Sequence, residues 1–145
     1  MEIIDIIKKI DEKQLFVPAF QREYVWKRDN AKDLVRSLIK KYPTGTMLTW
    51  ETNAPPELKG SYVHDESRGS VKLILDGQQR VTTLYMLITG SIPPYYSDEE
   101  ITNKIFDMHV NIETLDLEYY KRTSMENNHA WVNVNAVLKG EIEPR

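Results

Sequence analysis

Apolar side chains recur at the spacing of an amphipathic helix in the first half of the chain. Met1–Ile10 has isoleucines on one side and charged residues on the other, which predicts a short helix. A second stripe follows Asp29 or Asn30, either of which can cap a helix, and this helix is expected to end at Tyr42-Pro43. The apolar positions of the second stripe are Ala31, Leu34, Val35, Leu38 and Ile39.

Alternating apolar and polar positions, or short apolar runs, predict strands. The segments concerned are residues 15–17, 46–50, 71–75, 106–112, 115–119 and 131–134. The run at 71–75 is apolar except for Lys72, which predicts a mostly buried strand. Strict alternation begins at Phe106, and a turn near Glu113-Thr114 follows it, so we predict a hairpin there.

Turn and loop signals separate these elements. Gly90 suits the C-cap of a helix that begins after Gly77, and Ser97–Glu100 has the pattern of a capping box that opens a short helix. Residues 51–70 are rich in Pro, Gly, Ser and charge, which predicts an exposed loop. Another polar loop is predicted at 123–129, and residues 135–140 are expected to begin a last helix.

These elements predict an α/β chain of the mixed α+β type, with one small mixed sheet and flanking helices in a single domain, 1–145. The 145 residues suffice for one core, and 41% apolar with 28% charged residues is ordinary for a soluble globular chain. The sequence has no apolar run long enough to span a membrane and no signal-peptide pattern. We therefore expect a cytoplasmic protein that does not bind membranes.

Charge and cysteine content exclude several kinds of function. A net charge of −3 argues against a domain that grips DNA with a broad basic face, although it allows a local basic pocket. The absence of cysteine excludes disulfides, thiolate metal sites and cysteine nucleophiles. His64 lies in a polar loop with no second histidine at ligand spacing, and His109 falls on the polar face of its predicted strand, so both are expected on the surface. The chain also lacks a P-loop motif and a HExxH motif.

The polar cluster Asp76–Thr83 lies where the buried strand turns into a helix. Val81, Leu84, Tyr85 and Ile88 fall on one face of that helix. At such a junction the backbone N–H groups and the positive end of the helix dipole attract an anion. Gly77 has no Cβ to keep a ligand away from the backbone. Arg80, in the first turn, opposes the dipole, and a bound phosphate would make that position favourable.

A purely structural interpretation of this cluster stays open. Asp76 is a possible N-cap, and Gln79, three residues later, would complete a capping box. Such a cap contributes about 1 kcal/mol and needs no ligand. It does not account for Gln78, Arg80 and the pair Thr82-Thr83 together.

Residues 14–28 form a second unusual segment, in which aromatic and basic side chains are interleaved. They include Phe20, Gln21, Arg22, Tyr24, Trp26, Lys27 and Arg28. One interpretation is a buried aromatic loop with solvated charges. The other is a pocket wall, in which the aromatic rings pack on a base and Arg22 holds phosphate. The pair Gln21-Arg22 repeats Gln79-Arg80, so the two arginines are candidates to converge on one anion.

Several motifs in a fixed order resemble one known family. They are Val17-Pro18, Phe20-Gln21-Arg22, Tyr24, Trp26, Pro43, Gly45, Trp50, and Ile74 to Arg80 followed by Thr82-Thr83-Leu84. This pattern resembles the N-terminal domain of GmrSD-type restriction proteins, a family with a DGQQR motif in the ParB/sulfiredoxin-like superfamily. The resemblance implies a compact ParB/sulfiredoxin-like domain that is a fragment of a longer protein. The sulfiredoxin branch uses a catalytic cysteine, which this chain lacks.

The resemblance also implies a nucleotide site. The implied catalytic residues are Arg80, Arg22, Gln79, Gln21 and Asp76. The implied nucleotide-binding residues are Gly77, Gln78, Thr82, Thr83, Tyr24 and Trp26. Beside phosphate, Asp76 would need Mg²⁺ as a bridge, a capping role, or a contact with another part of the nucleotide, and the residues alone leave these open.

The leading hypothesis is a domain that binds and hydrolyses a nucleoside triphosphate with Mg²⁺ and regulates an HNH-type nuclease in an anti-phage or modification-dependent restriction system. Arg80 and Arg22 would stabilise charge, and Gln79 or Gln21 would position water. The alternative is a ParB-like module that senses a nucleotide or contacts DNA without turnover. A third possibility is a scaffold that retains the motif for folding. Nuclease activity is not expected from this chain, DNA contact would be indirect, and a homo-oligomer is possible.

Overall fold

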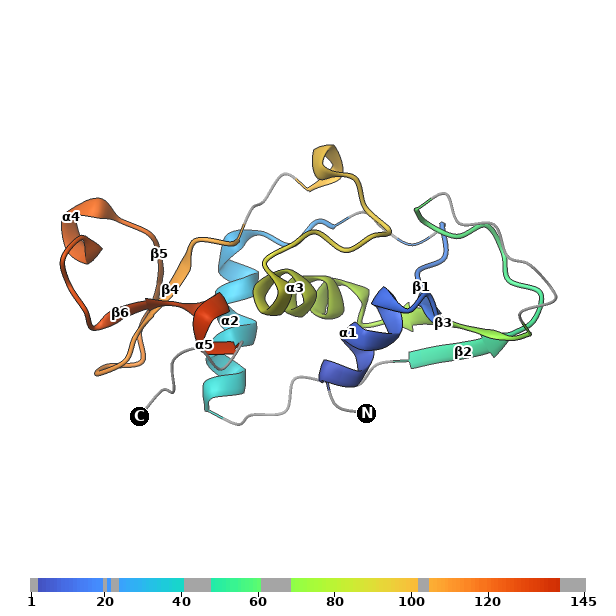
Figure 1. Cartoon of the computed structure of the whole chain (residues 1–145), viewed down its shortest axis with the longest axis horizontal. Helices are drawn as coiled ribbons and strands as arrows, with labels where there is room; N and C mark the ends of the chain where they lie inside the picture. The colour runs from blue at the N-terminus through green and yellow to red at the C-terminus, as the bar shows by residue number, and fades with distance from the viewer. Residues whose placement is uncertain are drawn as a thin grey trace.

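The computed structural model describes residues 3–19, 21, 24–40, 48–60, 69–101 and 105–138. Figure 1 shows an elongated molecule with a small sheet near each end and the helices α2 (Arg28–Ile39) and α3 (Gln78–Thr89) between the sheets. The mixed α+β class is therefore confirmed. Among the described residues, no helix combines the length and the apolar character needed to cross a membrane.

The first sheet is mixed and has β3 (Val71–Asp76) in its centre. On one side β3 pairs in parallel with β1 (Leu15–Phe16), and on the other it pairs antiparallel with β2 (Leu48–Thr52). The predicted buried strand at 71–75 is thus confirmed, with Leu73 and Ile74 fully shielded from solvent. An apolar strand favours the central position, because a strand with a neighbour on each side is shielded better from solvent than an edge strand.

A second sheet, which the sequence did not indicate, is antiparallel. It has the order β5 (Leu117–Tyr119), β4 (Met108–Asn111), β6 (Trp131–Asn133). The predicted hairpin is confirmed as β4 and β5, in which Val110 lies opposite Leu117. The polar segment that follows the hairpin forms a short helix, α4 (Arg122–Met125), where a loop was predicted. The strand β6 leads directly into α5 (Val134–Leu138).

The main core forms where α1 (Ile3–Asp11) and α3 meet the first sheet. The apolar face predicted for the first helix is confirmed at Ile6, Ile7 and Ile10, all of which are buried. The largest fully buried side chains of this core are Ile74, Met86, Leu87, Ile101, Ile105 and Met108. They come from both halves of the chain, so the core joins the first sheet to the segment that leads into the second.

Helix α3 is buried around most of its circumference, although the sequence predicted one apolar face. Thr82 and Thr83 have no exposed surface, whereas Leu84 and Ile88 are only half-buried. The reason is that α3 contacts α1, α2 and α5 as well as the core below it. Figure 1 shows this central position. Polar side chains of the helix must consequently find partners inside the protein.

The helix ends agree only in part with the sequence prediction. Lys27 is the N-cap of α2, so the proposed caps Asp29 and Asn30 are already helical. Asn30 nevertheless accepts a hydrogen bond from the Lys27 N–H group at 2.9 Å through its Oδ1 atom. Gly90 ends α3 in the left-handed conformation, as predicted. The capping box at Ser97 is also confirmed and opens a short 3₁₀ helix, Asp98–Glu100.

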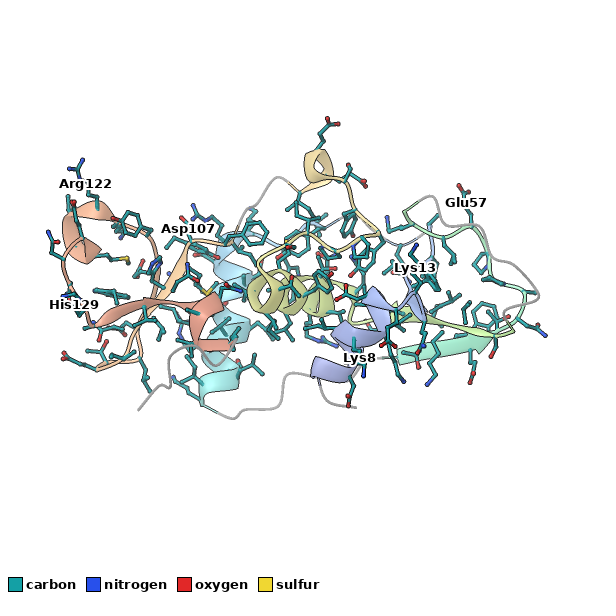
Figure 2. The ribbon with its side chains drawn as sticks, in the orientation of Figure 1. Lys8, Lys13, Glu57, Asp107, Arg122 and His129 are labelled. Atoms are coloured by element: carbon teal, nitrogen blue, oxygen red, sulfur yellow. The ribbon has the colours of Figure 1, made fainter. Side chains whose placement is uncertain are left out.

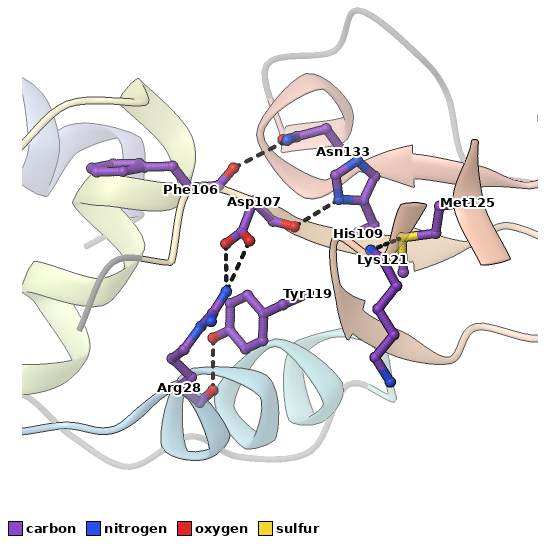
Figure 3. Close-up of polar contacts among 8 residues, drawn as sticks. All are labelled: Arg28, Phe106, Asp107, His109, Tyr119, Lys121, Met125 and Asn133. Atoms are coloured by element: carbon purple, nitrogen blue, oxygen red, sulfur yellow. Dashed lines mark hydrogen bonds and ion pairs between the residues drawn. The ribbon is translucent and has the colours of Figure 1, made fainter. Parts of the chain in front are cut away.

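Arg28 joins the start of α2 to the second sheet (Figure 3). Its Nη2 atom donates to both carboxylate oxygens of Asp107, at 2.7 and 2.9 Å. The guanidinium carbon lies 3.7 Å from the centre of the Tyr119 ring, and the Tyr119 hydroxyl donates to the Arg28 carbonyl oxygen at 2.7 Å. An exposed ion pair alone contributes little, but ring stacking and the backbone bond define the orientation of this junction.

Residues 51–70 were predicted as an exposed loop, and this prediction is wrong at two places, because β2 continues to Thr52 and the chain is not exposed at Leu58. Leu58 is buried and packs with Phe16, Val71 and Leu73 in a second apolar cluster. The Lys59 N–H group donates to the Val17 carbonyl oxygen at 2.9 Å, which ties the loop to the chain beside β1. Residues 61–68, including His64, lie outside the described residues, as do the turn at Thr44-Gly45 and the predicted helix end at Tyr42-Pro43.

We predict that Gly60→Ala destabilises the fold by about 2–5 kcal/mol, because it combines left-handed strain with a backbone clash. Gly60 has φ +87°, and a Cβ there would lie 2.8 Å from the Cα of Tyr95. Gly69 is the matched control, since it has φ +80° but nothing within 4 Å of the added Cβ. Gly69→Ala should cost about 1–2 kcal/mol from strain alone. Urea unfolding of both variants measures the difference, and equal costs would contradict the proposed contact.

Candidate functional site

The site begins at the turn that leads from β3 into α3. Gly77 is the N-cap of α3 and has φ 90° and ψ 7°, the left-handed region that favours glycine. Asp76 is exposed and accepts the Gly77 N–H bond at 2.9 Å through its Oδ1 atom. The predicted capping box is therefore wrong, because Asp76 precedes the N-cap and the Gln79 side chain bonds elsewhere. The capping interpretation does not explain this motif.

A cleft of about 280 Å³ opens at this turn. It is lined by Gln21, Trp26, Leu75, Asp76, Gly77, Gln78, Gln79 and Arg80. The first turn of the twelve-residue helix α3 thus forms one wall. Backbone N–H groups in the first turn of a helix have no acceptor within that helix, so this wall presents the positive end of the dipole.

The Gln79 side chain connects the turn with the aromatic segment more than fifty residues earlier. Its Oε1 atom accepts hydrogen bonds from the N–H groups of Val25, at 2.9 Å, and Trp26, at 3.3 Å. Its Nε2 atom donates to Oε1 of Gln78 at 2.7 Å. Both ends of the Gln79 amide are consequently engaged by the protein itself. This arrangement brings Trp26 to the cleft.

Gln78 and Thr82 point into the interior. Gln78 is 5% exposed, and its Nε2 atom donates to the Tyr96 hydroxyl and to Oγ1 of Thr82. Thr82 is fully buried, and its hydroxyl forms a 2.9 Å hydrogen bond with the hydroxyl of Tyr95. The Thr82 hydroxyl therefore lies in a buried polar network, and Thr82 does not line the cleft.

Thr83 and Tyr24 form a second buried pair. Their hydroxyls are 2.8 Å apart, and Thr83 also bonds the Gln79 carbonyl oxygen at 2.8 Å. Tyr24 is 4% exposed, so its ring belongs to the core and does not line the cleft. Of the two aromatic residues implied in nucleotide binding, only Trp26 lines the cleft.

The two Gln-Arg pairs can be compared at three of their four positions. Gln21 lines the cleft and donates from Nε2 to the Leu75 carbonyl oxygen at 3.0 Å, just before the Gly77 turn. Arg80 is half-buried and also lines the cleft. Arg22 lies outside the described residues. The expected approach of the first pair to the second is thus seen for Gln21, and the role of Arg22 stays a prediction.

The described residues contain no group of three or more His, Asp or Glu side chains that could hold a metal ion. Asp76 provides one exposed carboxylate at the cleft. Mg²⁺ often binds through one or two carboxylates, with phosphate oxygens and water completing its coordination. The chemistry of Asp76 therefore fits a Mg²⁺ ion carried by a phosphate ligand and does not fit a site made of protein groups alone.

A comparison with known families identifies the family of this chain. The family described as GmrSD restriction endonuclease, N-terminal domain, matches residues 3–141. The chain belongs to this family. The GmrSD N-terminal domain was expected from the DGQQR turn and the aromatic segment, and the match covers both of them and the second sheet.

A longer archaeal relative resembles this GmrSD-type domain. An uncharacterized protein of Methanocaldococcus jannaschii is 29% identical over 150 residues, covering 87% of this chain. The aligned region is 25% of that relative. The chain therefore spans about a quarter of the length of the relative that it matches.

Sequence reasoning missed Tyr95 and Tyr96, which complete the polar network of the GmrSD-type site. They follow Pro93-Pro94, and their rings are tilted with centres 5.1 Å apart. Burial raises the pKa of the Tyr95 phenol well above its ordinary value, while the hydrogen bond from Thr82 lowers it slightly. Burial likewise raises the pKa of Tyr24. No local spacing signalled these contacts, because the partners are more than ten residues apart.

The raised phenol pKa values predict alkaline sensitivity. Below a pH of about 10, the ordinary tyrosine pKa, the phenols are neutral in both the folded and the unfolded chain, so their ionisation does not change the unfolding free energy. Above it the unfolded chain loses the proton while folded Tyr95 keeps it, so Tyr95 alone lowers the unfolding free energy by about 1.4 kcal/mol per pH unit. Stability should therefore fall as the pH rises above about 10, through the window up to the raised pKa. Urea unfolding at a series of alkaline pH values measures this slope.

Two variants isolate the contribution of Tyr95. Tyr95→Phe removes the ionisable phenol and should flatten the alkaline slope by about one proton. Thr82→Val removes the same 2.9 Å hydrogen bond but keeps the phenol, so it should lower stability at neutral pH without flattening the slope. An unchanged slope in Tyr95→Phe would contradict the buried, neutral state of this residue.

Proposed function

We propose that this domain binds a nucleoside triphosphate in the cleft at Gly77 and thereby regulates a restriction system. The observation that carries the proposal is the placement of the cleft at the N-terminus of α3, with a left-handed glycine at the turn. A Gly turn followed by a helix N-terminus is a common binding arrangement for phosphate. Arg80, on the same wall, supplies a cation with the geometry to pair with phosphate oxygens.

The size of the cleft favours recognition of the phosphates. Its volume of about 280 Å³ is at the lower end of small-molecule pockets, which begin at about 300 Å³. In the proposal the phosphates occupy the cleft, while the ribose and base lie toward Trp26 and outside the turn. A half-exposed indole can pack on a sugar or base without selecting one base.

In this proposal Mg²⁺ accompanies the nucleotide and neutralises phosphate charge. Asp76 would hold the ion, and Gln21, the backbone at Gly77 and Arg80 would hold the phosphates. Hydrolysis would require Arg80, together with Arg22, to stabilise the charge that develops on the phosphate. Gln21 is the better candidate for orienting water, because both ends of the Gln79 amide already bind protein groups.

The engaged Gln79 amide also favours the alternative, a domain that senses a nucleotide without turnover. In that case binding alone would act on the rest of the protein. The chain matches a quarter of its longer relative, and a restriction endonuclease needs a nuclease. We therefore propose as partners an HNH-type nuclease domain or subunit and, through it, DNA. A cytoplasmic location and a possible homo-oligomer belong to the same proposal.

Thermal shift with ATP, GTP, CTP and UTP, each with and without Mg²⁺, tests nucleotide binding. A ligand at about 100 times its Kd stabilises by about 2.7 kcal/mol, which for a chain of this size raises Tm by about 5–10 °C. Arg80→Ala should weaken binding about 10–100-fold, because it removes a charge-assisted contact to phosphate. No stabilisation of the wild-type domain by any of the four nucleotides would overturn the proposal.

Arg122→Ala is the matched control for charge loss. Arg122 lies on α4, is exposed, and among the ion pairs described pairs only with Glu126, the C-cap residue of that helix. Figure 2 places it at the end of the molecule that carries the second sheet, away from the first sheet and its turn. This variant should keep the full nucleotide shift. An equal loss in both arginine variants would mean that overall charge, and not the cleft, controls binding.

Phosphate release separates hydrolysis from sensing. Sustained release with Mg²⁺ and the nucleotide that stabilises the domain, lost in Gln21→Leu, would support turnover in the cleft. Binding without release would support the sensing alternative.

A further inference from the structure

We propose that Gln79 is a positioning residue that holds Trp26 as a wall of the nucleotide cleft. This inference rests on the proposed function for its ligand, but its geometric part concerns the protein alone. Gln79 lies between the phosphate-binding turn and the aromatic segment, and it bonds both. Its role is then to shape the site, whereas the sequence suggested that it orients water.

The side chain of Gln79 is itself held by a hydrogen bond to Gln78. Its Nε2 atom bonds Oε1 of Gln78, and the Nε2 atom of Gln78 bonds Tyr96 and Thr82 in the buried network. Gln78, Thr82 and Tyr96 are almost or completely shielded from solvent, so few alternative rotamers are available to the Gln78 amide. The chain of amides thus transmits the rigidity of the core to Oε1 of Gln79, the atom that faces the aromatic segment.

The backbone N–H groups of Val25 and Trp26 share one acceptor, Oε1 of Gln79. Both residues lie outside any helix or strand, between Tyr24 and the start of α2, and both N–H groups point to Oε1 of Gln79. Val25 is 48% exposed, so packing contributes little to its placement. Tyr24 on one side and Arg28 on the other are anchored separately, through Thr83 and through Asp107. Gln79 therefore controls the short stretch between two fixed ends.

Glutamine has the two functions that this position requires. The oxygen accepts two N–H bonds, and the amide nitrogen donates to another carbonyl oxygen. Leucine has a similar size but can do neither. Glutamate keeps the acceptor for Val25 and Trp26 and loses the donor, and it also adds a negative charge beside the proposed phosphates. These two substitutions separate the hold on Trp26 from the effect on the ligand.

Hydrogen exchange in the wild-type domain gives a test that needs no variant. If Gln79 holds the segment, the amides of Val25 and Trp26 should exchange at least about tenfold more slowly than amides of an unstructured chain. Exchange of both amides at unprotected rates, measured by NMR without nucleotide, would overturn the inference. Val25 is decisive, because its exposed side chain offers no other reason for protection.

Trp26 fluorescence gives a second test, in a chain where Trp50 and Trp131 are replaced by phenylalanine. Trp50 is 45% exposed on β2 and Trp131 lies on β6, so neither replacement touches the cleft. Gln79→Leu should make Trp26 more accessible to acrylamide and shift its emission to longer wavelength. Gln79→Glu keeps the acceptor but loses the bond to Gln78, so its effect should be smaller than that of Gln79→Leu. Unchanged accessibility in Gln79→Leu overturns the inference whatever nucleotides do.

The matched control is Gln14→Leu, which makes the same chemical change at an exposed position after α1. It should leave Trp26 emission and quenching unchanged. Far-ultraviolet circular dichroism checks that each variant is folded. If Gln79→Leu does not fold, the hydrogen-exchange experiment on the wild-type domain decides whether Gln79 holds Trp26. An equal effect of Gln14→Leu would show that the fluorescence change is not specific to Gln79, and would overturn the inference.

Nucleotide titrations then test whether the position of Trp26, held by Gln79, affects nucleotide binding. In the single-tryptophan parent, the nucleotide that stabilises the domain should quench Trp26, and Gln79→Leu should raise its Kd about tenfold or more. If phosphate is released, the KM should rise with little change in kcat, whereas a water-orienting residue would lower kcat. A lower kcat at unchanged KM overturns the positioning role. The domain could also bind none of the nucleotides while Trp26 becomes more exposed in Gln79→Leu. That result would support the positioning role of Gln79 and overturn only the proposed ligand.

Discussion

Everything about this site depends on the burial of α3 with polar side chains on its inner faces. A hydroxyl or amide that enters the core without a hydrogen bond costs several kcal/mol, so each such group must find a partner there. Gln78 and Thr82 find theirs in Tyr96 and Tyr95, and Thr83 finds Tyr24. These bonds fix how α3 is rotated about its axis. The same rotation decides which residues remain at the cleft.

The DGQQR turn is consequently divided between two tasks. All five residues line the cleft, but the Gln78 amide bonds groups in the core and the Gln79 amide bonds the aromatic segment. A site supported in this way is shaped before a ligand arrives, which lowers the conformational entropy that binding must overcome. For a GmrSD N-terminal domain, this means that the motif carries the architecture of the site as well as its chemistry.

Local patterns predicted those parts of the fold that neighbouring residues decide. The apolar run at 71–75, the glycine after it and the C-cap at Gly90 defined the strand, the turn and the helix end. The capping prediction failed because Gly77 takes the N-cap position. The exposed loop failed at Leu58, since only the folded chain presents the apolar cluster against which it packs. The hairpin β4–β5 was predicted, but its pairing with β6 in a separate sheet was missed, because partners distant in sequence cannot be read from alternation alone.

The sequence by itself determined the order of elements around the turn, the requirement for glycine at position 77, and the family, because each rests on residues close together or on motifs in a fixed order. Only the tertiary structure decided which motif residues face the cleft. A helix advances about 100° per residue, so the direction of each side chain depends on which faces are covered. The partners that cover or hold them, Tyr96 for Gln78 and Val25 for Gln79, are distant in sequence.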